Sequence, residues 1–171
     1  MEEFGPIQIL VVGFGSTDFT GEVMAEVRRL RDRDVIRLVD LVVVAKGADG
    51  EVVSVETSDL TAEQSAEFGA IAGALIGLGA DGEEGAEAGA VAGAEAAIES
   101  EGEFLGDEVM WSIADTIPEG TTAAVALLEH RWAIPLRDAI RNVGGVVLAD
   151  NWLHPEDLVA FGMAMGDSAS S

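Results

Sequence analysis

The chain has 171 residues, of which 32 are acidic and 9 are basic, so its formal net charge is −23. This length predicts a single domain over residues 1–171, large enough for a substantial core. The charge disfavours binding to nucleic acid and to anionic membrane surfaces, because both present phosphate to the protein. The chain holds no cysteine, which excludes disulfides and thiolate chemistry. We interpret the acidic surface as solubilising; a cation-binding face is the alternative, but no calcium-loop spacing is present.

Residues 7–12 form a short apolar run that predicts a buried strand, and Gly13-Phe14-Gly15 ends it. A Gly-x-Gly turn before a helix can cradle a phosphate, but Asp18 stands where the dinucleotide-binding pattern has its third glycine. The negative charge of Asp18 would oppose a pyrophosphate. We therefore expect a plain strand-to-helix turn and no nucleotide cofactor.

Residues 21–33 predict an amphipathic helix, because apolar residues recur there at helical spacing. Five of the nine cations lie on or just after this helix: Arg28, Arg29, Arg31, Arg33 and Arg37. Two interpretations stay open. The arginines form a solvated face paired with Glu22 and Glu26, or they form a docking face for the acidic surface of another copy.

Residues 35–45 form the strongest predicted strand, and their apolar character on both faces places the strand centrally in a sheet. Arg37 and Asp40 interrupt this run. They lie three positions apart, hence on opposite faces of a regular strand, so we expect no ion pair between them. Residues 51–56 alternate as an adjacent strand should, after a short turn.

The stretch from Ser65 to Ser100 is unusual because glycine recurs at every fourth position in two triplets. These are Gly69, Gly73 and Gly77, and then Gly85, Gly89 and Gly93. At about 100° per residue, each triplet forms a groove of bare backbone, and such grooves let two helices approach closely. Glycine costs about 1 kcal/mol per residue relative to alanine in a helix, which only close packing offsets. We expect a helical hairpin that turns at residues 79–82 and is capped at its start by Asp59 or Thr61.

The first helix of this hairpin carries a large apolar face opposite its groove. Such a face marks an interface unless the same chain covers it. The residues of the expected interface are Phe68, Gly69, Ile71, Gly73, Leu75, Gly77, Leu78, Gly85, Gly89 and Gly93. Two alternatives are a flexible Gly/Ala-rich connector and membrane insertion. The latter is disfavoured because the longest apolar run, residues 68–80, is shorter than the about 20 residues that a span needs.

Past the hairpin, residues 106–116 predict a short helix and residues 122–128 a second central strand. A helix over residues 136–143 follows, and residues 146–149 predict a further strand. A last helix is expected to begin near Pro155.

The polar cluster that is the strongest candidate for catalytic chemistry is Glu129-His130-Arg131, with His154 elsewhere in the chain. A general base needs a partner and a pocket, whereas consecutive residues on a strand point in alternating directions. A lone histidine also carries no metal-ligand spacing. We interpret this cluster as a solvated strand end and expect no catalytic residue, no metal and no cofactor.

Strand-helix-strand therefore occurs twice, over residues 7–45 and 122–149. This order predicts an α+β fold: a ferredoxin-like plait of two β-α-β units, with its helices stacked on one face of the sheet. The Gly/Ala-rich helical hairpin, residues 59–104, would be an insertion, and residues 166–171 a flexible tail. The second face of the sheet would also be apolar and would pair with another copy.

Val11-Val12-Gly13-Phe14, then Ile-Arg-Leu-Val-Asp-Leu-Val-Val-Val-Ala-Lys (36–46) with Asp49-Gly50, resembles a family of small bacterial and archaeal proteins of unknown function. Glu129, Trp132 and Gly144-Gly145 are similar to that pattern too. Its members share a central glycine-zipper segment and are often labelled membrane or stress-related proteins. The resemblance covers residues 7–150 and implies a compact α+β domain with a Gly/Ala-rich helical insertion, without an activity. The chain departs from the membrane label, because acidic residues such as Asp81 and Glu87 cut its apolar stretch short.

Taken together, these features predict a non-enzymatic protein that self-associates through its sheet and its glycine-rich helices. We expect it in the cytoplasm, because no signal peptide precedes the first strand. Two alternatives are a small-ligand-binding or regulatory ferredoxin-like domain, with a pocket between sheet and helices, and a peripheral membrane protein that inserts its glycine-rich hairpin.

Overall fold

The computed structural model describes residues 4–16, 21–152, 154–155, 157–160 and 162. The chain divides into two compact units, residues 1–136 and residues 137–171. Asp18, which opposed the nucleotide interpretation, and the expected tail at residues 166–171 lie outside the described residues.

The fold is α+β, as expected. Its elements are β1 (Ile7–Phe14), α1 (Gly21–Asp32), β2 (Ile36–Lys46), β3 (Val52–Thr57), α2 (Ala62–Glu99), α3 (Gly106–Thr116), β4 (Thr121–His130) and α4 (Ala133–Asn142). The strand predicted over residues 35–45 and the helix predicted over residues 106–116 are confirmed as β2 and α3.

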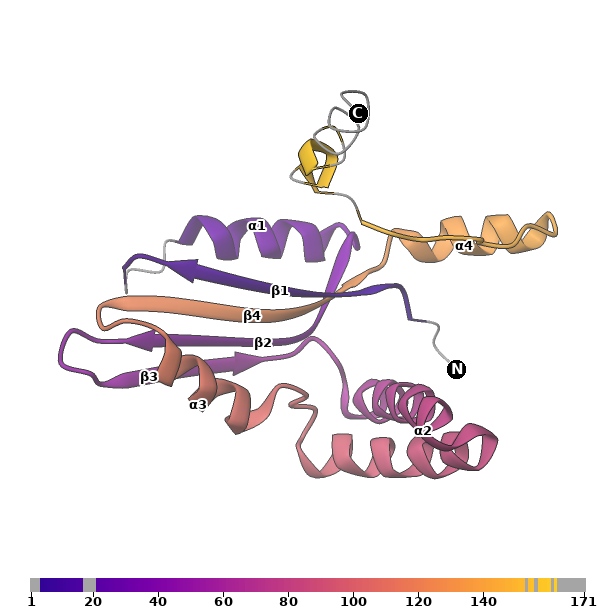
Figure 1. Ribbon diagram of the computed structural model, residues 1–171, viewed down its shortest axis with the longest axis horizontal. Helices are drawn as coiled ribbons and strands as arrows, with labels where there is room; N and C mark the ends of the chain where they lie inside the picture. Colours follow the sequence, from indigo (N-terminus) through magenta and orange to yellow (C-terminus); the bar gives the residue numbers. More distant parts are fainter. Residues whose placement is uncertain (1–3, 17–20, 153, 156, 161, 163–171) are drawn as a thin grey trace, which may run out of the picture. The chain divides into compact units, whose positions relative to one another are not determined.

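Within the described residues, four strands form one antiparallel sheet in the order β1-β4-β2-β3 (Figure 1). Successive residues of β2 are buried on opposite faces: Leu41 lies in a cluster with Met24 and Val27 of α1, whereas Val42 lies in a cluster with Ile113 of α3. The expectation that the helices stack on one face is therefore wrong. Because β2 is apolar on both sides, each face needs its own cover.

The first strand-helix-strand unit is confirmed as β1-α1-β2, with β4 lying between its two strands. The second, expected over residues 122–149, is wrong. Residues 146–149 are not a strand, and the side chains of Val146 and Leu148 are 80% and 95% exposed. Their β-branched and aliphatic character gives strand propensity, but no described strand pairs with this segment. The chain instead reaches β4 from β3 through α2 and α3, with β2 lying between β3 and β4.

An irregularity in β2 corrects a second expectation. Arg37 pairs with Glu129 of β4, but Asp40 pairs with Leu127, because the register shifts between Leu38 and Asp40. This β-bulge inserts one extra residue, so Arg37 and Asp40 lie on the same face of the sheet rather than on opposite faces. Arg37 instead pairs with Glu129: the Nε atom of Arg37 lies 2.6 Å from Oε2 of Glu129.

Helix α2 begins with a capping box, in which Thr61 Oγ1 accepts from the Gln64 amide and Gln64 Oε1 accepts from the Thr61 amide. Of the two expected caps, Thr61 is therefore the one used. Asp59 instead accepts from the Leu38 amide at 2.9 Å. Within α2, Asp81 and Gly82 have non-helical backbone angles, with φ of +64° at Gly82, so α2 consists of two helical arms joined at this point.

Candidate functional site

The two arms of α2 pack glycine against glycine. A methyl group built on Gly69 would overlap the carbonyl oxygen of Gly93, one on Gly73 that of Gly89, and one on Gly77 that of Gly85. We call these six residues the glycine seam. The seam lies inside one chain, so the structure places the glycines of the expected interface against each other rather than on the surface.

The large side chains of the expected interface have two different environments. The ring of Phe68 packs edge-on against the rings of Phe4 and Phe104, with centroid distances of 5.2 and 4.9 Å, and Ile71 is half-buried. Leu75 and Leu78 are 65% and 49% exposed. Together with further exposed residues of α2 they form its exposed apolar set: Leu75, Ile76, Leu78, Val91 and Ile98.

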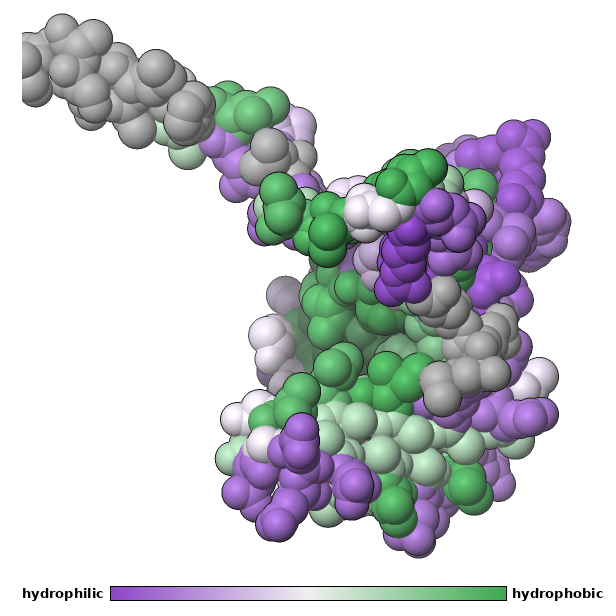
Figure 2. Space-filling view, turned by 90° about the vertical axis from the view of Figure 1, so that its right-hand side faces the viewer, coloured by the Kyte–Doolittle hydropathy of each residue, from purple (hydrophilic) through white to green (hydrophobic). Residues whose placement is uncertain are grey.

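The side of the molecule where α2 lies is seen in Figure 2, in which pale and deep green surface covers much of the lower part, with hydrophilic groups at its margins. Among the described residues, no helix has both the length and the apolar character that crossing a membrane requires.

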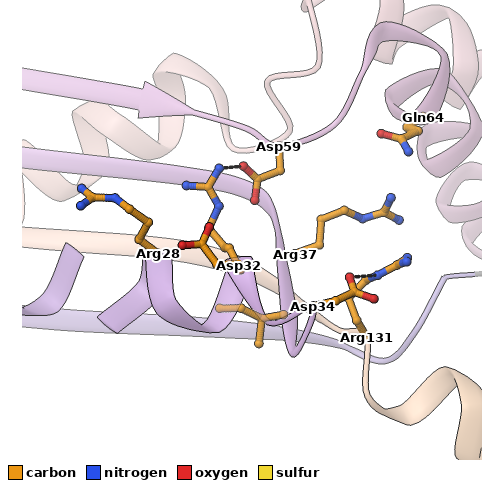
Figure 3. A pocket seen from close by; sticks show the side chains of 9 residues that line it. Arg28, Asp32, Asp34, Arg37, Asp59, Gln64 and Arg131 are labelled. Carbon is orange, nitrogen blue, oxygen red and sulfur yellow. Dashed lines mark hydrogen bonds and ion pairs between the residues drawn. The ribbon is translucent and has the colours of Figure 1, made fainter. Parts of the chain in front are cut away.

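A polar hollow of about 550 Å³ lies near the end of α1 and the start of β2. Its lining residues are Arg28, Arg31, Asp32, Asp34, Ile36, Arg37, Asp59, Gln64 and Arg131. We call it the arginine hollow. Arg37 and Arg131 extend toward Gln64 and α2, whereas Arg28 stands at the α1 end (Figure 3).

The charges of the hollow differ from those of the whole chain. Four arginines against three aspartates give the lining a net charge of +1, in a chain of net charge −23. Arg31 pairs with Asp59, and Nε of Arg131 lies 3.0 Å from Asp34 Oδ1. The side chain of Arg28 makes no hydrogen bond or ion pair with any described residue. The hollow is thus a local gathering of cationic groups on an acidic protein.

Behind the hollow, the side chain of Glu129 is completely buried. One carboxylate oxygen accepts from the Gly5 amide at 2.7 Å and lies 3.9 Å from Nη1 of Arg131, and the other binds Arg37. The guanidinium of Arg37 also lies 4.8 Å from the centre of the Phe4 ring. The expected solvated strand end is therefore wrong for Glu129, because β4 is a central strand and its last residues are covered by β1, β2 and Gly5.

His130 points away from Glu129, as alternation on a strand requires. Its Nε2 atom lies 3.0 Å from Gln8 Oε1, and its Nδ1 accepts from the indole N–H of Trp132 at 3.3 Å. Burial lowers the pKa of His130. In the part of the chain that the structure describes, no group of three or more acidic or histidine side chains is arranged to hold a metal ion.

A second, acidic pocket of about 230 Å³ lies beside the loop that leads into α3. Asp40 is completely buried there, and its Oδ2 accepts from the amides of Phe104 and Leu105 at 2.7 and 2.8 Å. Desolvation, together with the nearby carboxylates of Asp40 and Glu103, raises the pKa of Glu56 to about 7. Glu56 is therefore a partly protonated carboxyl at neutral pH.

Sequence reasoning noted the arginines of α1 and β2 but did not join them to Arg131, Asp59 or Gln64. The signal for α1 and β2 was the local density of arginine. Arg131 reaches the hollow only because β4 lies beside β2, an arrangement set by long-range strand pairing.

Comparison of this chain with known protein families, with curated proteins and with solved structures finds no match.

Proposed function

We propose that this is a non-enzymatic cytoplasmic protein that self-associates, with the exposed apolar set of α2 as the main contact between copies. The observation that carries the proposal is that the glycines and the large apolar residues of α2 have different environments. The six glycines of the seam contact one another within the chain. Leu75 and Ile76 remain 65% and 74% exposed. Exposed apolar patches of this kind mark interaction sites, because their burial contributes about 25 cal/mol per Å².

The edges of the sheet support the same proposal. β1 and β3 are the edge strands. Ile9 and Val11 of β1 are 64% and 65% exposed, and Val53 and Val55 of β3 are 58% and 60% exposed. An edge strand presents unpaired backbone groups as well as these side chains, so it is a template for pairing with another chain. Two kinds of surface therefore favour association.

The test is the mass of the purified protein by size-exclusion chromatography with light scattering, at several concentrations. We expect a multiple of the chain mass for the parent. Leu75→Glu should reduce this mass while its circular dichroism stays like that of the parent, because Leu75 supports little of the fold. Ala48→Glu, which adds the same charge on the exposed turn between β2 and β3, is the matched control and should associate like the parent.

A parent that stays a single chain at every concentration would contradict self-association itself. If Leu75→Glu keeps the mass of the parent, the contact between copies does not depend on Leu75, and the sheet edges become the favoured place for it.

The exposed apolar set could also contact lipid, which is the membrane alternative. The acidic residues of α2, among them Glu83, Glu84 and Glu87, oppose an anionic surface. We therefore expect the protein to stay in the dense fraction when it is floated with vesicles of neutral or anionic phospholipid. Flotation with neutral vesicles would favour a peripheral membrane role over self-association.

For the fold, we propose a variant of the ferredoxin-like plait into which the hairpin of α2 is inserted. The support is that both connections, β1 to β2 and β3 to β4, skip one intervening strand, as split β-α-β units do. The variant divides its helices between the two faces. Nuclear Overhauser contacts of Val125 with both Val11 and Val42 would test this strand order, and their absence would overturn it.

A further inference from the structure

We propose that the arginine hollow binds a small oxyanion, a carboxylate or a phosphate carried on a small molecule. This site is separate from the exposed apolar set of α2 and does not depend on self-association. The hollow's volume of about 550 Å³ lies within the range of about 300–1,000 Å³ that is typical of ligand pockets. Its polar lining suits a charged ligand rather than an apolar one.

The arginines reach the hollow from separate parts of the chain. Arg28 and Arg31 come from α1, Arg37 from the start of β2, and Arg131 from the residue after β4. Guanidinium is the side chain whose planar fork matches carboxylate and phosphate oxygens in pairs. Four of the nine cations of the chain therefore gather around one hollow.

The arginines are also held in place from behind. Glu129 is fully buried and binds Arg37 through Nε, and Asp34 binds Arg131 through Nε. The Phe4 ring packs against the Arg37 guanidinium. Asp59, fixed by the Leu38 amide, holds Arg31. Side chains ordered in this way lose less freedom when a ligand binds, which favours affinity.

The buried pair of Arg37 and Glu129 adds a second argument. Breaking such a pair is costly, but the intact pair gives little net stability, because removing both charges from water offsets their attraction. Stability alone therefore does not explain why this pair is built. A positioning role for Glu129, which aligns Arg37 and lies near Arg131, does explain it.

Arg28 is the residue with which to test the site. It lines the hollow and its side chain has no hydrogen bond or ion pair with the described residues, so replacing it leaves no buried carboxylate without a partner. Arg29 is its matched control. It lies next to Arg28 on α1, pairs with Glu26 and does not line the hollow.

The experiment is titration calorimetry of the full chain with inorganic phosphate and, separately, with succinate, at an ionic strength held constant with sodium chloride. We expect saturable binding of at least one of the two. Arg28→Gln should weaken it about tenfold, the loss of one charge-assisted contact, whereas Arg29→Gln should bind like the parent. Binding of phosphate alone would indicate a phosphorylated ligand, and binding of succinate alone a carboxylic acid.

Two outcomes would overturn the proposal. One is the absence of saturable binding for both probes. The other is an equal loss of affinity in Arg28→Gln and Arg29→Gln, since that would reflect only the overall charge of α1. A thermal melt of each variant without ligand checks that both are folded as the parent is.

Discussion

The sheet and the two arms of α2 achieve close packing in opposite ways. In the sheet, large side chains fill the space: Val42 and Val44 of β2 are 1% and 0% exposed and pack beneath α3. In α2, side chains are missing where the arms meet, and backbone touches backbone along the glycine seam. The sheet is stabilised by large buried side chains, and the contact between the arms of α2 by the absence of side chains.

This difference matters for the response of each region to substitution. A hydrophobic core loses free energy when methyl groups are removed, because a cavity remains. A seam of bare backbone loses free energy when a methyl group is added, because neither arm has a flexible side chain that could move aside. Each region should therefore tolerate the change that damages the other.

The largest effect should come from the seam. Gly73→Leu places a side chain where Gly89 already lies, so we expect the free energy of unfolding to fall by about 3 kcal/mol or more. Gly79→Ala, on the same arm, has nothing within 4 Å of its new methyl group and should stabilise α2 by up to about 1 kcal/mol. Chemical denaturation followed by far-ultraviolet circular dichroism measures both. If the two variants have the same free energy of unfolding, glycine packing does not hold the two arms of α2 together.

The converse substitution in the sheet should have a smaller effect. Val44→Ala removes two methyl groups from a fully buried site beneath α3, and we expect a loss of about 2 kcal/mol. Val53→Ala on β3, where the side chain is 58% exposed, is its control and should lose less than about 0.5 kcal/mol. The same denaturation experiment compares them. Equal losses at the two positions would mean that the face beneath α3 is not a packed core.

A third test concerns Glu56, a half-buried carboxyl at the end of β3, rather than the apolar core. The pKa of Glu56 is raised to about 7 from 4.5, so between these values the folded chain holds a proton that the unfolded chain releases. The contribution of Glu56 to the free energy of unfolding should therefore fall as pH rises from about 4.5 to 7 and then level off. Glu56→Gln removes this penalty. It should be more stable than the parent by about 1 kcal/mol at pH 8, after discounting for solvent screening, and equal to it near pH 4.5.

The control for this test is Glu51→Gln, at an exposed position just before β3. It should change stability little across the same pH range. A gain for Glu56→Gln that does not grow with pH would show that the ionised carboxyl is not the destabilising species.

The smallest effect concerns the acidic surface. A net charge of −23 repels itself, and salt screens this repulsion over about 10 Å at 0.1 M. We expect the melting temperature to rise from low salt to 1 M sodium chloride, with most of the gain at the low end of the range. A flat profile would show that the negative charges are too far apart to affect folding.

Local patterns predicted much of the sheet and of the seam. Apolar residues on both faces over residues 35–45 identified β2 as central, and the four-residue spacing of glycine indicated close backbone contact. Besides the placement of helices on both faces of the sheet, two further features were not predicted. The β-bulge near Asp40 comes from one extra residue in a pairing with β4, and no pattern within β2 indicates it. Residues 146–149 have strand propensity, but propensity does not supply a neighbouring strand.

The arginine hollow was predictable only in part, for the same reason. The arginines near residues 28–37 stood out because cations are scarce in the chain. Glu129 and Arg131 belong to the site through the pairing of β4 with β2, and their local sequence suggested an exposed strand end instead. The contact of Glu129 with Gly5 joins residues 124 positions apart, which is beyond any local signal.

The strand order also bears on how the chain acquires its structure during synthesis. β4 is the last of the described strands to be made, yet it lies between β1 and β2. These two strands can join one sheet only once β4 has been made. A nascent chain that stops before residue 121 can form the hairpin of β2 with β3 and the short-range contacts of α2, but it leaves β1 without a partner. Contacts of such long sequence separation slow folding. Pulsed hydrogen exchange should therefore protect the amides of α2 earlier than those of β1, and simultaneous protection would mean that the sheet and the hairpin fold as one unit.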